Sequence, residues 1–170
     1  MTEASEMTKL KLGFVHRVEH IRDGVVLDVE EIHNLVPDQG LDYILNAALR
    51  GTTPITAWYV ALFEGNYTPT SGITASTFPA TATECTTYDE ATRVVWTSAA
   101  ASGGIITNSA SKAVFTINAT KTVYGVAMSS VAAKSDTGGV LTSVARFASA
   151  KNVVDNDILN VTSTLTLTSA

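Results

Sequence analysis

The chain has 170 residues, a single cysteine and a formal net charge of −5. A chain of this length usually forms one domain with its own hydrophobic core, and one cysteine excludes both an internal disulfide and a cysteine-based zinc site. The acidic balance disfavours nucleic acid and anionic membranes as partners, and no apolar stretch approaches the ~20 residues that span a bilayer.

The chain begins with a polar arm that leads into a predicted β-hairpin. Residues 1–8 are polar and acidic and lack the basic and apolar segments of a secretory signal, so we expect no export. Apolar and polar side chains then alternate over residues 9–21, and Asp23-Gly24 is a typical two-residue hairpin turn. We therefore predict a hairpin over residues 9–33.

A two-residue turn fixes which residues of the hairpin face each other. In that register Arg17 lies opposite Glu30 on the polar face, and Val18 lies opposite Val29 on the apolar face. Both are favourable cross-strand pairs. The polar face of the hairpin is therefore a candidate contact surface.

The same register offers one candidate metal site on the hairpin. His16 would face Glu31 and lie diagonal to His33, which is a two-histidine, one-carboxylate set that zinc could bind. An enzyme would need these three side chains to converge in a pocket. Histidines at the margin of a small hairpin are more often structural and no fourth ligand is evident, so we predict no metal.

Residues 37–50 form the one convincing helix of the sequence. Pro37 suits its first turn, and Gly51 can end it in a left-handed conformation. Its apolar residues recur at the spacing of one helical face, so we expect the helix to plug one end of a β-structure. The members of this stripe are Leu41, Ile44, Leu45 and Ala48.

The stretch Trp58–Phe63 is apolar on both faces, which is typical of a central strand covered on both sides. Residues 64–87 follow as a long Thr-, Ser- and Pro-rich excursion. Excursions of this length usually bind or wrap something, so we expect a subunit contact there.

Short β-branched and aromatic segments fill the rest of the chain. Their spacing predicts a mainly β fold: a jelly-roll-like antiparallel β-sandwich with an N-terminal β-hairpin and one short α-helix. We expect a single domain over residues 9–170, with sandwich strands over residues 56–168. The predicted strands are Tyr88–Thr97, Gly104–Asn108, Lys112–Ala119, Thr122–Val131, Val140–Phe147 and a last strand after residues 155–157.

Motifs for catalysis or cofactor binding are absent from the sequence. It contains neither a Gly-x-Ser-x-Gly elbow nor a phosphate-binding loop, and Cys85 lies in a neutral segment typical of a packing residue. The run Asp155-Asn156-Asp157 lacks the ligand spacing of a calcium loop and predicts a polar turn. We therefore expect no catalytic residue, cofactor or metal, and no enzyme activity.

Several stretches resemble small structural proteins of tailed bacteriophages. These are Asn34–Leu45 followed by Trp58–Phe63, then Tyr88–Trp96, and Asn108–Ile117 continuing to Val123–Val126. Within that group, jelly-roll cement or decoration proteins match the size and acidity of this chain. The resemblance implies synthesis in the host cytoplasm and a place on the capsid exterior of the virion, bound to the major capsid protein. The alternative is a tail, baseplate or fibre-associated module that binds a receptor such as a host glycan.

Contact residues for such a role are expected on three elements: the arm, the polar face of the hairpin and the long excursion. They are Thr2, Glu6, Arg17, Glu30, Tyr67, Thr70 and Phe78. Self-association into a dimer or trimer is also expected, because closed symmetry would cover exposed edge strands.

Overall fold

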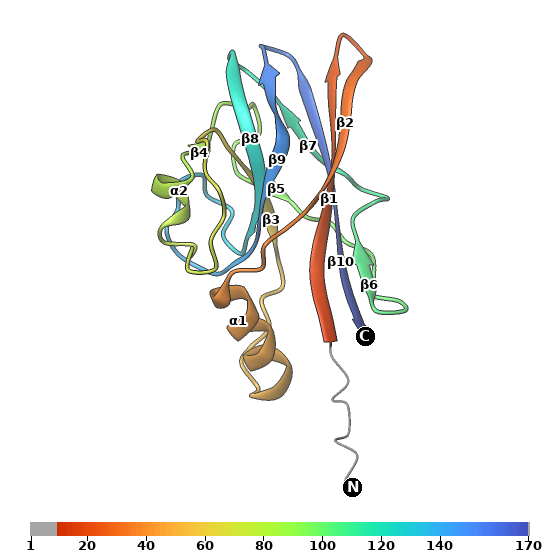
Figure 1. The fold of residues 1–170 in the computed structure, drawn as a ribbon, viewed down its shortest axis with the longest axis vertical. Helices are drawn as coiled ribbons and strands as arrows, with labels where there is room; N and C mark the ends of the chain where they lie inside the picture. Colours follow the sequence, from red (N-terminus) through yellow and green to blue (C-terminus); the bar gives the residue numbers. More distant parts are fainter. Residues whose placement is uncertain (1–9, 170) are drawn as a thin grey trace, which may run out of the picture.

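The computed structural model describes residues 10–169. The fold is mainly β, with two antiparallel sheets and two helices in this range (Figure 1). The two sheets face each other across a shared hydrophobic core. The arm over residues 1–8, with the predicted contact residues Thr2 and Glu6, lies outside the described residues.

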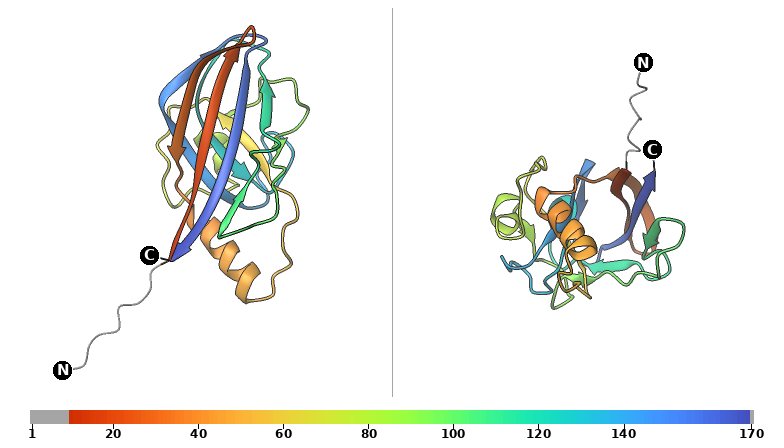
Figure 2. Two further views of the ribbon diagram at one scale, coloured as in Figure 1. Left: turned by 90° about the vertical axis from the view of Figure 1, so that its right-hand side faces the viewer. Right: turned by 90° about the horizontal axis from the view of Figure 1, so that it is seen from below.

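The first sheet is built on a long ribbon of the first and last strands. β1 (Leu10–Arg22) pairs along its whole length with β10 (Ile158–Ser169), from Leu10 opposite Ser169 to Ile21 opposite Ile158. β2 (Val25–His33) extends the sheet beyond β1 as its edge strand, which is seen best on the left of Figure 2. The other edge of β10 pairs with β6 (Ile105–Thr107) and β7 (Ala113–Thr116).

The second sheet has β3 (Tyr59–Phe63) near its centre. β3 pairs with β8 (Lys121–Ser129) on one side and with the short strands β4 (Glu84–Cys85) and β5 (Val94–Val95) on the other. β9 (Leu141–Val153) pairs with β8 and forms the edge.

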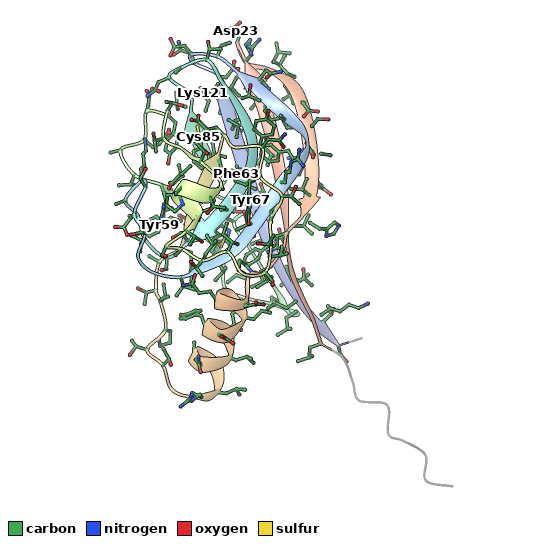
Figure 3. All side chains as sticks on the ribbon, turned by 60° about the vertical axis from the view of Figure 1, so that its left-hand side comes forward. Asp23, Tyr59, Phe63, Tyr67, Cys85 and Lys121 are labelled. Carbon is green, nitrogen blue, oxygen red and sulfur yellow. The ribbon has the colours of Figure 1, made fainter. Side chains whose placement is uncertain are left out.

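Both faces of β3 are buried, as its sequence predicts. Val60 and Leu62 point into the core between the sheets, while Ala61 and Phe63 point into a second apolar cluster on the outer face. Residues 64–83 cover that outer face and include the short helix α2 (Phe78–Thr81) (Figure 3). The excursion is therefore used largely to cover its own sheet.

The helix α1 (Asp38–Leu49) forms as predicted, and Gly51 follows it at φ 71°. The prediction that it plugs the sandwich is wrong, because Leu41, Leu45 and Leu49 are 39%, 57% and 78% exposed. Gly40 is the buried position of α1, and in Figure 1 the rest of the helix extends beyond the sheets.

Close backbone packing at the first turn of α1 explains this placement. A Cβ on Gly40 would lie 2.9 Å from both the carbonyl oxygen of Leu141 and the Cα of Thr142. The side-chain oxygen of Gln39 accepts hydrogen bonds from the backbone amides of Ala75 and Leu141 at 2.9 and 3.0 Å. α1 is thus held by its N-terminal turn and leaves its leucines uncovered.

The predicted strand over Tyr88–Thr97 is mostly irregular. Within it, Val94–Val95 form β5, and Tyr88 makes a single bridge to Ile117. The chain bends between these points and turns the side chain of Arg93 inward to Glu84. A continuous strand is incompatible with that turn.

Candidate functional site

The hairpin turn forms as predicted, but the register beyond it is shifted by one residue. Asp23 and Gly24 have φ of 52° and 76°, as this tight turn requires. A β-bulge then interrupts the pairing, because Ile21 faces Val26 while its neighbour His20 faces Asp28. In the predicted register Glu19 would face Asp28, an unfavourable pair of like charges, whereas in the structure Glu19 faces Val29.

This shift overturns the predicted cross-strand pairs. Arg17 faces Glu31 instead of Glu30, and Val18 faces Glu30 instead of Val29. The guanidinium of Arg17 hydrogen-bonds to Glu19 and lies 4.0 Å from the carboxylate of Glu31. Arg17 and Glu30 therefore do not form the predicted pair.

Glu30 instead joins the two sheets. Its carboxylate and that of Asp28 bind the ammonium group of Lys151 on β9, which is 3% exposed. Glu30 also accepts a hydrogen bond from the backbone amide of Ala148. Burial disfavours the charge of Lys151, but the two carboxylates outweigh it and raise its pKa. These contacts hold the edge strand β2 against β9.

The predicted candidate metal site does not assemble. His16 faces Ile32, and its fully buried ring is hydrogen-bonded to Ser163 Oγ and Ser143 Oγ, both at 2.7 Å. Burial lowers the pKa of His16 to about 3, so the ring is neutral. His33 is exposed. Over residues 10–169, His, Cys, Asp and Glu side chains form no group of three that could hold a metal ion.

The three contact residues predicted in the excursion have different environments. Phe78 is 1% exposed and packs edge-to-face on Phe63 at 6.3 Å between ring centroids, so its prediction as a contact residue is wrong. Tyr67 is half-buried against the same cluster, and its hydroxyl lies 3.1 Å from that of exposed Thr70 (Figure 3). The apolar side chains of the excursion therefore serve its own packing.

Asp157 has a structural role that its polar sequence context concealed. Its buried carboxylate accepts hydrogen bonds from Arg22, His20 and the backbone amide of Val154 at 2.8 to 2.9 Å. The Arg22 guanidinium, with help from His20, holds the pKa of this carboxyl well below its usual range. The predicted turn forms at Asp155 and Asn156, but the third residue ties it to β1.

Cys85 is fully buried, which confirms its prediction as a packing residue, and burial raises the pKa of its thiol. A buried thiol with a raised pKa is a poor nucleophile.

Two groups of exposed apolar side chains in residues 10–169 each lie on one element, and the other exposed large apolar residues are Leu10, Val95, Ile105, Val114 and Leu167. The first is the hairpin end of β2, where four apolar residues are each at least 44% exposed: Val25, Val26, Leu27 and Val29. The second is the uncovered stripe of α1, formed by Leu41, Leu45 and Leu49. In Figure 1 the hairpin turn lies at the top of the molecule and α1 at the bottom. We call these the hairpin surface and the α1 surface.

Comparison with protein-family models and with curated proteins gives no match for this chain. Neither helix in residues 10–169 is long and apolar enough to cross a membrane.

Proposed function

We propose that this protein is a non-enzymatic structural protein of a tailed-bacteriophage virion. In this role it binds the outer surface of the capsid and stabilises the shell as a cement or decoration protein. Its partner is the major capsid protein, and the sequence resemblance to phage structural proteins suggested this class.

The observation that carries the proposal is the pair of apolar surfaces at opposite ends of the molecule. Exposed apolar residues that cluster on a soluble chain mark contact sites with other proteins. Because the hairpin surface and the α1 surface lie far apart along the long axis in Figure 1, one copy can contact two neighbouring subunits. Many copies that bridge neighbours in this way would stabilise a shell through avidity.

The strand connections are compatible with the jelly-roll arrangement of this class. The chain passes between the sheets after β2, β5, β7 and β9, and the first long strand pairs with the last. We propose the jelly-roll on this basis.

Particles that lack the protein provide the test. We expect them to release their nucleic acid at a lower temperature and after a milder osmotic shock than complete particles, and to recover when the purified protein is added back. Equal resistance with and without the protein would contradict the cementing role.

Copy number separates this proposal from the alternative of a tail, baseplate or fibre module. A decoration protein is present in numbers comparable to the capsid subunits, whereas a tail module is present in a few copies. Quantitative gel densitometry of purified particles therefore distinguishes the two roles.

A further inference from the structure

A cavity of about 350 Å³ lies beside α1, at the end of the sandwich that the helix fails to plug. Its walls come from both sheets and from the helix. Phe14 and Trp96 pack against each other in this lining, with ring centroids 6.3 Å apart, and Tyr43 and Trp58 form a second aromatic pair. Ile44 and Met128 also line the cavity. All its lining residues are uncharged.

Two of the aromatic lining residues, Trp96 and Tyr43, have their polar atoms hydrogen-bonded within the protein. The indole N–H of Trp96 donates to the carbonyl oxygen of Ser163 at 3.1 Å, and the hydroxyl of Tyr43 accepts from the amide of Ile55 at 2.6 Å. Tyr43 and Trp58 pack edge-to-face at 5.5 Å between ring centroids. The guest that suits these walls is neutral and apolar, preferably a flat ring.

The volume of the cavity sets the size of the guest. An apolar cavity of roughly 150 Å³ holds one benzene molecule. The cavity beside α1 is more than twice as large, which leaves room for a fused ring such as indole, the side chain of tryptophan.

We propose that this cavity is the pocket into which the partner of the chain inserts a bulky aromatic side chain, and this rests on the proposed function. The α1 surface adjoins the cavity, because Leu41 lies one turn before the lining residue Ile44 on the same face of the helix, and Leu45 lies one turn after Leu41; both leucines are exposed. A small free ligand would leave these leucines in water. A protein surface that inserts one aromatic side chain into the cavity would also cover Leu41 and Leu45. The two leucines would then lie around the inserted side chain and keep water away from it.

The test uses the full chain, indole as the probe, and one variant that fills the pocket from its rim. Ser98 lines the cavity and is half-buried in a segment outside the strands, so Ser98→Phe adds a ring there without removing a core residue. Ser109→Phe adds the same ring in an exposed turn and is the matched control. Circular dichroism and a thermal melt establish that both variants are folded.

Indole binding is measured by calorimetry, and binding to particles stripped of the protein is measured by sedimentation. We expect the natural chain and Ser109→Phe to bind both indole and particles. Ser98→Phe should lose indole binding and bind particles about tenfold or more weakly.

Two results would contradict the proposal that the partner inserts an aromatic side chain into this cavity. One is a natural chain that does not bind indole. The other is a Ser98→Phe chain that loses indole binding yet binds particles as tightly as the control, and this result leaves the proposed function standing. If the natural chain binds indole but no stripped particle, the proposed function fails and the capsid anchor fails with it.

Discussion

Arg93 and Glu84 form a bidentate ion pair that is buried from solvent. Nε and Nη2 of Arg93 donate to the two carboxylate oxygens at 2.8 and 2.7 Å, and each side chain is 1% exposed. Arg93 also donates to the carbonyl oxygens of Val131 and Asp136, both at 3.1 Å. The pair therefore fastens the loop after β8 to strand β4.

Arg93→Ala should lower the free energy of unfolding by about 3–5 kcal/mol, because it leaves a buried carboxylate without its partner. Urea denaturation measures this change. The control is Lys121→Ala, whose partner Glu64 lies 3.1 Å away and whose own side chain is 35% exposed. That variant should lose less than about 1 kcal/mol, and equal losses would contradict the structural role of Arg93.

The neutral, buried ring of His16 predicts a loss of stability in mild acid. Burial lowers the pKa of His16 from 6.5 to about 3, so between these values the unfolded chain binds a proton that the folded chain excludes. Stability from this residue is fully present above pH 6.5 and falls as the pH decreases toward 3, by up to about 1.4 kcal/mol per pH unit.

His16→Gln keeps polar atoms near Ser143 and Ser163 but cannot take up that proton. Urea midpoints across the same pH range should therefore depend less on pH for this variant than for the natural chain. The other titrating groups are common to both chains and cancel in the difference. Parallel pH profiles would show that His16 titrates normally.

Gly40→Ala should displace α1 from the sheet. The added Cβ would meet backbone atoms of Leu141 and Thr142 at 2.9 Å, and backbone cannot move aside as a flexible side chain can. We expect a loss of about 1–3 kcal/mol in thermal or urea unfolding. Gly72→Ala is the control, since no atom lies within 4 Å of its added Cβ. A Gly40→Ala chain as stable as this control would contradict the close packing of α1.

Leu27→Lys tests the hairpin surface. Leu27 is 51% exposed on the edge strand, so the folded monomer should change by less than about 0.5 kcal/mol. A lysine on an exposed edge opposes strand pairing between molecules and the burial of that surface. We expect weaker self-association in analytical ultracentrifugation and weaker binding to stripped particles. Ser109→Lys adds the same charge in an exposed turn and should leave both unchanged.

Local signals in the sequence predicted the main elements of the fold. The doubly apolar run of β3, the Asp23-Gly24 turn and the periodicity of α1 each depend on neighbouring residues, and each element forms where expected. The turn fixes only the pairs next to it, and the bulge between His20 and Ile21 shifts every pair beyond them. For this reason the predicted site around His16 failed although its turn was correct.

Local sequence patterns also do not predict whether an apolar helix face is buried in the folded chain. The spacing in α1 indicates that its leucines share a face, but helical periodicity does not say whether this chain covers that face. The inward turn of Arg93 had no signal either, because its neighbours Asp89 and Glu90 suggest an exposed polar segment. Its partner Glu84 is identified only once the loop after β8 is folded around both.

The pairing of β1 with β10 has a consequence for the order of events during synthesis. β1 is synthesised before the other strands of its sheet. The strand with which it pairs along its whole length, β10, becomes available only after residues 158–169 have left the ribosome. Contacts of such long sequence separation slow folding to a timescale of about milliseconds to seconds. The first sheet therefore completes only once β10 has emerged, and until then the apolar face of β1 is open to chaperones or to another nascent chain.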